Sequence, residues 1–429
     1  MHVLGVINQP VPRLMRKDNL MKLAVKPFRA TRYNSSRIKD YSKVVCPPYD
    51  VISKKQLKVL RKKSPYNFSH IIIADNGNYK RSSVLLQNLV KNKILIEDKE
   101  ENFYLYEQKF KVEGKKFNRF GILLLLKMDD NGIFPHEHTL RGPKEDRKRI
   151  IKATQANLSP VFIIAAKYLG SLHKVHAQYS RQKPHLSLKD DEGNYNRLWK
   201  INDKVKIAQL TKAITNSKLV IADGHHRFEI SFDYFKKNKG KFKDLNYILA
   251  FVTDYQKGLN ILPTHRVVSL RDKPGVVLAK LGDNFEIKQV SKEELGKKIK
   301  AKGEFCFGIY CAGKFYFLKL GNKKILNKIP NKVYKQLDTY VFHQLVLPLF
   351  DRIGEIEYTH SIAQAVQLAG KKKTAFILRA VSLDSVFKIS SKGFRLPQKS
   401  TYFYPKILSG IVLRRFEKKG AASKEGALE

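Results

Sequence analysis

The alternation of hydrophobic and polar residues predicts two β-hairpins, each centred on a short turn that contains glycine. The first is expected over residues 103–127 with its turn at Gly114, and the second over 305–320 with its turn at Gly313. Tight hairpin turns need residues with positive φ, which glycine adopts without steric cost. The pattern therefore predicts long paired strands in both halves of the chain.

Segments with helical periodicity lie between these strands, but strands and helices do not alternate regularly along the chain. A short buried strand over 219–222 precedes a helix that carries Phe228, Phe232 and Phe235 on one face. Further helices are expected over 145–156, 290–303, 339–350 and 361–368. Because strands and helices mix irregularly, we expect the α+β class, in which the strands do not form a doubly wound parallel sheet.

The length of 429 residues predicts more than one domain. Residues 1–20 lack periodicity and are expected to be a disordered or mis-started N-terminal extension. The final residues are rich in Gly, Ala, Ser, Lys and Glu, which is typical of a frayed tail. The expected segments are a disordered extension over 1–20, a catalytic domain over 21–270, a smaller α+β domain with a docking arm over 271–416, and a disordered tail over 417–429.

The chain is strongly basic, with a formal net charge of +45. Lysine and arginine attract phosphate backbones at low salt, so weak non-specific nucleic-acid binding is expected. The basic residues are scattered over many segments, however, and this is typical of a solvated surface. No apolar run is long enough to span a bilayer, and three cysteines suit a reducing compartment. We therefore expect a cytoplasmic protein without a membrane partner.

The sharpest candidate for chemistry is the sequence Asp223-Gly224-His225-His226-Arg227. A strand ends in the aspartate, the glycine permits a sharp turn, and a helix begins with the histidines. The start of a helix presents free N–H groups and a positive dipole end to an anion. The arginine can grip a phosphate, and the aspartate can bind Mg²⁺ or accept a proton. The alternative is that the aspartate only caps the helix.

A second candidate lies at His136-Glu137-His138. In an extended chain the two histidines face one side and the glutamate the other. Glu137 is a candidate general base, and the histidines are candidate pocket residues or metal ligands together with Asp223 or His226. The spacing does not match the zinc motif His-Glu-x-x-His, which weakens the case for a zinc hydrolase.

Three other segments supply basic or pocket residues. Lys144 and Arg147 begin a helix and form either a further anion site or an exposed, salt-bridged first turn. Two prolines fix the turn that carries Tyr49 and Asp50, and these residues with the nearby Asn67 are candidates for a pocket wall.

The basic and aromatic segment 395–412 can either stack the bases of a nucleic-acid strand or act as a docking arm. We favour the docking arm, and expect it to supply Lys399 to the phosphate site. The chain has no Walker loop, no Gly-x-Gly-x-x-Gly and no Gly-x-Ser-x-Gly. The absence of these motifs argues against a P-loop NTPase, a classical dinucleotide-binding protein and an α/β-hydrolase.

Several longer motifs resemble a widespread prokaryotic family that is catalogued as a domain of unknown function and often labelled ParB-like. The resemblance extends from Met21 to about Leu413. It rests on CPPYDVIS from Cys46, SPYNFSHI from Ser64, HEHTLRGPKEDR from His136, QANLSPVF from Gln155, ADGHHRFE from Ala222, LPTHRVV from Leu262 and PQKSTYFYPKILSG from Pro397.

The Asp-Gly-His-His-Arg element is also similar to the phosphate-binding turn of the ParB/sulfiredoxin superfamily, which includes free-serine kinases. This resemblance implies a ParB/sulfiredoxin-like first domain, with Mg²⁺ and ATP or ADP as cofactors. It further implies that residues 223–227 hold phosphates and metal, and it makes Glu137 the candidate for the separate catalytic glutamate of those kinases. The chain is longer than a free-serine kinase, and it has no convincing DNA-reading helix-turn-helix.

The leading hypothesis is a nucleotide-dependent, kinase-like phosphotransferase that acts on a small hydroxyl metabolite, with free serine or a phosphoserine-related compound as the specific candidate. Glu137 or His226 would act as the base. One alternative is a ParB-like nucleic-acid-associated binding protein or nucleotide switch. Another is a metal-dependent hydrolase that uses His136, His138, His225 and His226.

Overall fold

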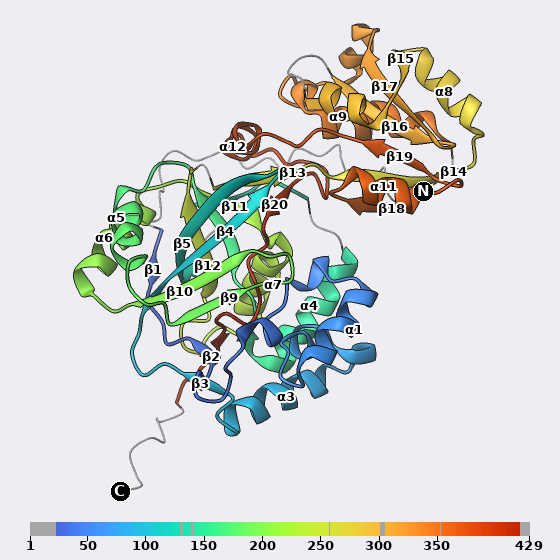
Figure 1. Ribbon diagram of the computed structural model, residues 1–429. Coiled ribbons are helices and arrows are strands. Elements are labelled where there is room, and N and C mark those ends of the chain that lie inside the picture. Colours follow the sequence, from blue (N-terminus) through green and yellow to red (C-terminus); the bar gives the residue numbers. More distant parts are fainter. Residues whose placement is uncertain are drawn as a thin grey trace, which may run out of the picture. The chain divides into compact units, whose positions relative to one another are not determined.

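The chain forms two compact units of mixed helices and strands, which confirms the α+β class (Figure 1). The computed structural model describes residues 23–128, 132–138, 141–256, 258–300, 305–351 and 353–420. Among these, the smaller unit comprises 136–138 and 260–404, and the remaining residues form the larger unit. The smaller unit thus begins at 260, where the sequence predicted 271, and the chain returns to the larger unit at 405. The predicted extension over 1–20 lies outside the described residues.

Nine of the described strands form the mixed sheet of the larger unit. Strands β6 and β11 pair in parallel, as do β8 and β12, and all other neighbours are antiparallel. The order is β6 (Ile133–Pro135), β11 (Leu219–Asp223), β8 (Val161–Ala165), β12 (Tyr247–Asp254), β5 (Lys115–Lys127), β4 (Phe103–Val112), β10 (Tyr195–Ile201) and β9 (Leu186–Lys189), while β1 (Val25–Lys26) also pairs with β5.

The first predicted hairpin is confirmed as β4 and β5. Glu113 and Gly114 have φ values of 48° and 79° at its turn, so both central residues are left-handed, as the right-handed twist of a two-residue hairpin requires. The two strands reach the middle of the sheet, where their apolar residues are fully buried.

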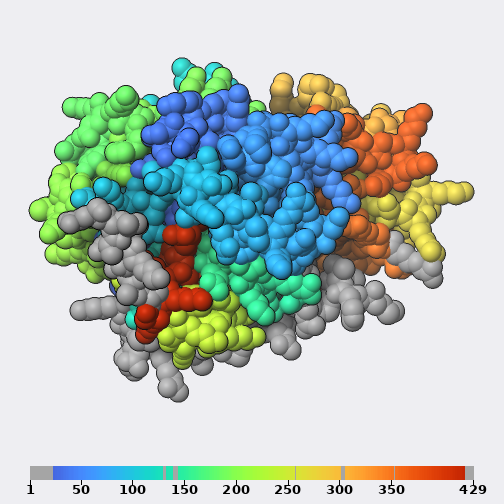
Figure 2. Space-filling model, turned by 90° about the horizontal axis from the view of Figure 1, so that it is seen from below, coloured from blue at the N-terminus to red at the C-terminus, as the bar shows by residue number. Residues whose placement is uncertain are grey.

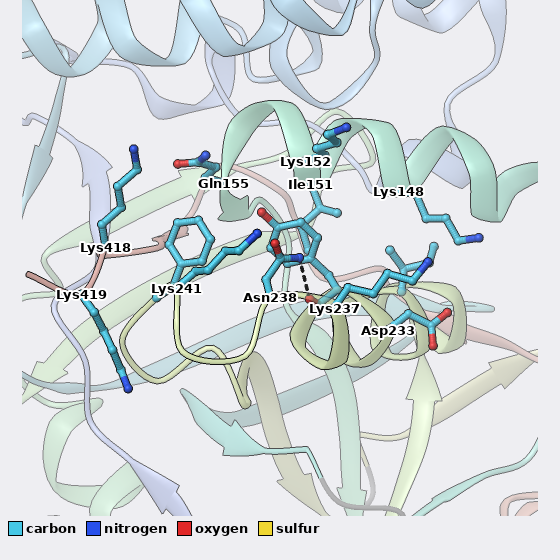
Figure 3. A pocket seen from close by; sticks show the side chains of 13 residues that line it. Lys148, Ile151, Lys152, Gln155, Asp233, Lys237, Asn238, Lys241, Lys418 and Lys419 are labelled. Atoms are coloured by element: carbon cyan, nitrogen blue, oxygen red, sulfur yellow. Dashed lines mark hydrogen bonds between the residues drawn. The ribbon is translucent and has the colours of Figure 1, made fainter.

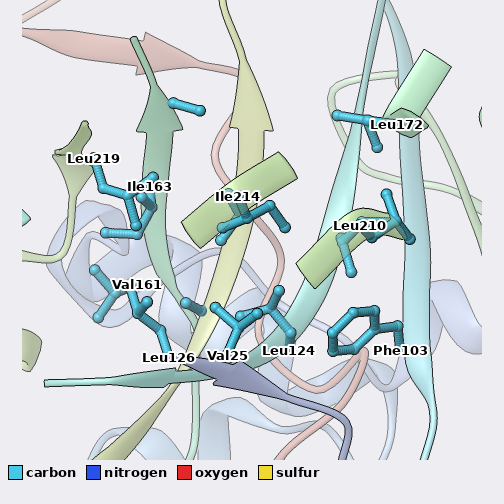
Figure 4. Close-up of a cluster of buried hydrophobic side chains, with 14 of the residues drawn as sticks. Val25, Phe103, Leu124, Leu126, Val161, Ile163, Leu172, Leu210, Ile214 and Leu219 are labelled. Atoms are coloured by element: carbon cyan, nitrogen blue, oxygen red, sulfur yellow. The ribbon is translucent and has the colours of Figure 1, made fainter. Parts of the chain in front are cut away.

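Two helices, α5 (Gly170–Tyr179) and α6 (Lys204–Thr215), pack their apolar side chains onto the sheet of the larger unit. Figure 4 shows Leu172, Leu210 and Ile214 from these helices among the side chains of the strands. Asp203 caps α6 by accepting a hydrogen bond of 3.1 Å from the Lys206 amide. Burial of the apolar side chains is the main source of stability here.

The remaining helices of the larger unit include α4, which contacts both α3 and α7. Ring contacts between Phe228 and Phe232 and between Phe232 and Phe235 confirm the predicted aromatic face of α7. These helices are α1 (Lys54–Lys63), α2 (Ser69–Ile72), α3 (Tyr79–Lys91), α4 (Arg141–Thr154) and α7 (His225–Lys237). Two short strand pairs complete the unit: β2 (Thr31–Tyr33) with β3 (Leu95–Glu97), and β7 (Ala156–Asn157) with β21 (Arg414–Arg415).

The smaller unit is built on an antiparallel sheet of six described strands. Its order is β15 (Phe285–Val290), β17 (Lys314–Leu320), β16 (Cys306–Cys311), β19 (Thr374–Ile377), β14 (His265–Leu270) and β18 (Ile353–Thr359). The β16–β17 pair confirms the second predicted hairpin. Outside this sheet, β13 (Asn260–Leu262) pairs with β20 (Tyr402–Tyr404).

Helices α9 (Lys292–Lys300) and α11 (Ile362–Ala369) pack on the sheet of the smaller unit, and the unit also contains α8 (Pro274–Gly282) and α12 (Leu383–Ser391). The helix predicted over 339–350 is not continuous. It is found as α10 (Asp338–Val341), a π-helical turn and a final 3-10 turn that contains Pro348. Proline has no backbone N–H, so it cannot continue an α-helical ladder.

None of the described helices combines the length and apolar character that crossing a membrane requires. The three cysteines are buried, and none forms a disulfide. Burial raises the pKa of the Cys46 thiol, which opposes formation of the reactive thiolate. This environment does not favour a nucleophilic role for Cys46.

Candidate phosphate site

The turn between β11 and α7 depends on a glycine. The β11–β8 register shifts between Ile221 and Asp223, an irregularity that can re-aim a side chain at the end of a strand. Gly224 follows with φ of 89°, a left-handed conformation, and α7 begins at His225. A Cβ atom at position 224 would lie 2.9 Å from the guanidinium of Arg227, which is too close for a real contact. The left-handed backbone therefore favours glycine here, and a side chain at this position would displace the Arg227 guanidinium.

The Asp223 carboxylate binds two basic side chains. Arg227 Nη2 donates to Asp223 Oδ2 at 2.6 Å, and Lys406 Nζ donates to Oδ1. Arg227 Nη1 also donates to the carbonyl oxygen of Pro160. The side chains are only 12% exposed for Arg227 and 9% for Lys406. Two nearly buried cations are thus held at the start of a helix.

The electrostatics of this cluster favour the ionised form of Asp223. Burial opposes ionisation, but the ammonium of Lys406 and the guanidinium of Arg227 outweigh it and hold the pKa of Asp223 well below its usual range. His225, which is itself buried, also interacts with this carboxylate. The aspartate therefore stays negatively charged at any physiological pH.

Lys406 is positioned by buried side chains of the central strands. Arg119 donates to the carbonyl oxygen of Pro405, and Gln108 Nε2 donates to that of Lys406 at 3.2 Å. Arg119 is fully buried, and burial lowers its pKa to about 9 although the Asp223 charge opposes this effect. The sheet thus fixes the backbone from which the lysine reaches Asp223.

Tyr49 lies in the electrostatic surroundings of the turn, and Arg147 packs against Tyr49. The Arg147 guanidinium lies 3.9 Å from the centroid of the Tyr49 ring. Burial raises the pKa of Tyr49, and its other electrostatic neighbours include Arg227 and Asp223. Arg147 also donates to the Ile72 carbonyl at 2.8 Å and to Asp146. The Arg147 guanidinium is therefore already held by Tyr49, the Ile72 carbonyl and Asp146.

The other predicted residues of the larger unit have structural partners. Lys144 Nζ lies 2.7 Å from Glu229 Oε2, an ion pair that joins α4 to α7. Asn67 is buried and donates to the carbonyls of Lys43 and Val45 at 2.7 and 3.2 Å. Asp50 is exposed. The Asn67 amide thus stabilises the Pro-containing loop.

The segment 136–138 and Lys399 belong to the smaller unit. His136 is buried, and its Nε2 lies 2.8 Å from Thr401 Oγ1. Glu137 Oε1 accepts the Ser400 amide at 3.0 Å, and the His138 amide donates to the Leu396 carbonyl at 3.2 Å. This segment therefore orders the main chain around Lys399, which has a φ of 54°.

The predicted residues thus fall into two groups. The structure gathers Asp223, Gly224, His225, His226 and Arg227 in one turn of the larger unit, with Tyr49 and Arg147 nearby. It places His136, Glu137, His138 and Lys399 together in the smaller unit.

Sequence reasoning missed Lys406, Arg119 and the Pro160 carbonyl. The available signal for Lys406 was its place in the same motif as Lys399, seven residues further along.

Among the described residues, no group of three or more His, Cys, Asp or Glu side chains is placed to hold a metal ion. The four histidines proposed for a hydrolase lie in different units, His136 and His138 in one and His225 and His226 in the other. The observed cluster is instead rich in basic side chains: Arg227, Lys406, Arg119 and His225 all interact with one carboxylate. Such an excess of positive charge at the start of a helix suits an anion.

Comparison with known proteins identifies the family. The sequence model of the family described as "Protein of unknown function (DUF1015)" matches residues 25–340. This match covers well over half of the chain, so the chain belongs to that family. The description carries no ParB label. No curated protein matches the chain.

Several solved structures are distantly similar. A conserved hypothetical protein from Pyrococcus furiosus has 15% identity and a TM-score of 0.35, with coverage of 69% of this chain and 94% of that chain. A free serine kinase in complex with AMP has 14% identity and a TM-score of 0.35, covering 66% and 86%. SbnI with a C-terminal truncation, from Staphylococcus aureus, has 11% identity and a TM-score of 0.34, covering 70% and 83%. Similarities of this size do not assign a function to the chain.

Proposed function

We propose that the chain is a nucleotide-dependent phosphotransferase whose phosphate site is the Asp223 turn, in a larger unit of the ParB/sulfiredoxin type. The observation that carries the proposal is the pair of nearly buried cations, Arg227 and Lys406, held on one carboxylate where α7 begins. Transfer of a phosphoryl group depends chiefly on positioning and on neutralising negative charge. These residues supply both.

A bound phosphate would add negative charge to a cluster in which cations outnumber the one carboxylate. The Arg227 guanidinium can form two parallel hydrogen bonds to phosphate oxygens, and the Lys406 ammonium can neutralise a further charge. The first amides of α7 supply additional donors. Because Gly224 has no side chain, a phosphate can approach the backbone of the turn closely.

The substrate we propose is a small hydroxyl metabolite, with free serine or a phosphoserine-related compound as the specific candidate. This choice rests on the similarity of the Asp-Gly-His-His-Arg element to that of free-serine kinases. Asp223 would orient the substrate hydroxyl, and its low pKa favours hydrogen bonding and charge stabilisation over proton abstraction. His226, in the same turn, and Glu137 are the two candidates for the base.

Magnesium fits this site only together with a nucleotide. No described cluster offers three ligating side chains, and Asp223 offers a single carboxylate. Proteins commonly hold Mg²⁺ through one or two carboxylates and the phosphates of the substrate. Where Asp223 binds the ion instead of orienting the hydroxyl, it would do so alongside phosphate oxygens, and the ion would offset charge on the transferred group.

Calorimetric titration of the full chain tests the proposal with ATP, ADP, CTP, GTP, pyrophosphate and phosphoserine, each with and without Mg²⁺. Arg227→Gln should weaken binding of the preferred compound by at least about tenfold, because a charged hydrogen bond is lost. The matched control is Lys206→Gln, which removes a cation from the Asp203 cap of α6 and should leave affinity unchanged.

A transfer assay with free serine follows, in which the nucleotide that binds is labelled in its terminal phosphate. Labelled phosphoserine, formed by the wild type and not by Arg227→Gln, would support the specific substrate. Failure of every phosphate compound to bind would refute the phosphate site itself. Binding without transfer to serine would refute only the choice of substrate.

A further inference from the structure

A second basic site lies at the other end of α7, in a pocket of about 760 Å³ within the larger unit (Figure 3). Its lining comes from α4, from α7 with the loop that follows it, and from the end of the described chain. In Figure 2, the red C-terminal residues lie beside the teal residues of α4 and the yellow-green residues after α7. Six lysines line the pocket: Lys148, Lys152, Lys237, Lys241, Lys418 and Lys419.

The charge of this lysine pocket is poorly balanced. Asp233 is the one acidic residue in its lining. Over the part of the chain that the structure describes, Lys148 forms an ion pair with Glu145 at 3.4 Å, whereas the other five lysines have no carboxylate within 4.0 Å. Lys144, on the same helix, does find such a partner in Glu229. The lining of the pocket therefore carries an excess of positive charge.

Main-chain hydrogen bonds hold the lysine-bearing segments together. The Lys243 amide donates to the Glu417 carbonyl at 2.8 Å, and the Lys419 amide donates to the Lys241 carbonyl at 3.1 Å. The Phe416 ring lies 5.9 Å from the rings of both Tyr234 and Phe242. Like charges are thus kept close by packing and backbone pairing, although their repulsion favours separation.

We propose that the lysine pocket binds the sugar–phosphate backbone of a single nucleic-acid strand. Lysine ammonium groups neutralise phosphates without reading bases, and the lining contains no arginine to recognise guanine. The lysines come from three segments, which suits phosphates spread along a chain. A duplex is far too wide for a pocket of this volume.

Two features disfavour a mononucleotide as the occupant. Residues from the C-terminal parts of α4 and α7 face this pocket, so no helix N-terminus offers amide donors to a compact phosphate group. The side-chain amide of Asn238 is also occupied, since it donates to the Tyr234 carbonyl at 2.9 Å. The site is therefore distinct in chemistry from the Asp223 turn, and it does not depend on the phosphotransferase proposal.

Fluorescence anisotropy of the full chain with labelled oligothymidylate and oligouridylate of about 20 nucleotides tests the proposal. The test variant is Lys237→Ala/Lys241→Ala/Lys418→Ala. Its control, Lys54→Ala/Lys55→Ala/Lys58→Ala, removes the same charge from exposed positions of α1. If three phosphate contacts are lost, the negative slope of log K against log salt becomes less steep by about 2. The affinity near 0.1 M salt then falls about 100-fold. The control should change affinity by less than about threefold.

The arginine variant Lys237→Arg/Lys241→Arg/Lys418→Arg should bind like the wild type, which would show that charge at these positions is what matters. Equal losses in the test and control variants would overturn the proposal, because binding would then reflect the net charge of the whole surface. Binding of inorganic polyphosphate but of neither oligonucleotide would also overturn it. A preference between the two oligonucleotides would identify DNA or RNA as the source of the strand.

Discussion

Helix α7 carries positive charge at both ends, but the two ends hold that charge differently. At its N-terminus, Arg227 and Lys406 are nearly buried and fixed by hydrogen bonds to Asp223. At its C-terminal end, Lys237 and Lys241 are exposed and have no described acidic partner. The N-terminal cations thus have one geometry, whereas the C-terminal lysines can follow the position of a ligand.

This difference predicts two modes of recognition. Buried, hydrogen-bonded cations are desolvated when the protein folds, so they can bind a phosphate in a defined orientation with little dependence on salt. Exposed lysines keep their hydration and release counterions on binding, so their affinity falls steeply with salt.

The largest effect is expected from Lys406→Met, which removes one of the two partners of a buried carboxylate. We expect the free energy of unfolding to fall by about 3 kcal/mol, because Asp223 keeps its charge but loses a compensating cation. Urea denaturation followed by circular dichroism measures this change. The double variant Asp223→Asn/Lys406→Met should recover part of the loss, since the buried charge is then absent. If Lys406→Met lowers the free energy of unfolding no more than Lys418→Met does, the contrast between buried cations at one end of α7 and exposed lysines at the other would be contradicted.

Glycine substitutions compare the backbone at the two ends. Gly224 and Gly240 have φ values of 89° and 82°, but only at Gly224 would a Cβ atom meet another residue, the Arg227 guanidinium. Gly240→Ala should cost about 1 kcal/mol for the left-handed backbone alone. Gly224→Ala should cost about 2 kcal/mol or more, and it should also abolish phosphate binding because Arg227 must move. Thermal unfolding measures the loss of stability, and the calorimetric titration measures the loss of phosphate binding. Equal costs at both positions would refute the packing of Arg227 over Gly224.

A pH dependence is expected only at the Asp223 end. The folded-state pKa of Asp223 lies below its ordinary value of 3.8, so its contribution to stability is complete above that pH and is lost as the pH falls below it. Each step of one pH unit in that window removes up to ~1.4 kcal/mol. The stability difference between the wild type and Asp223→Asn should be constant from pH 7 to about pH 4 and should narrow below that. Narrowing between pH 7 and pH 5 would show that another group controls the cluster.

What the sequence revealed of this site was local. The Asp-Gly-His-His-Arg element is contiguous, so the end of the strand, the glycine turn and the start of α7 could all be read from neighbouring residues. The two hairpins were equally accessible, because a glycine turn and alternating residues specify them within about twenty positions.

What the sequence did not reveal depends on tertiary pairing. Lys406 lies 183 positions from the carboxylate that it binds, and its backbone is held by residues of two central strands. The sequence predicts Lys399, in the same motif, as the lysine of the phosphate site, but the chain passes from the smaller to the larger unit between these two lysines. Residues 417–419, which composition assigned to a disordered tail, are paired with the loop after α7. Residues 421–429 lie outside the described part of the chain.

The smallest effect is expected from Lys418→Ala/Lys419→Ala at the C-terminal end. Both side chains are exposed and have no described acidic partner, so their removal should change the free energy of unfolding by less than about 0.5 kcal/mol. A slight stabilisation at low salt is the expected sign, because repulsion among the pocket lysines decreases, and it should vanish near 0.5 M salt, where screening is nearly complete. Urea denaturation at both salt concentrations measures the difference. A loss above 1 kcal/mol would show that the lysines stabilise the fold itself, and the distinction between a structural end and a binding end of α7 would then fail.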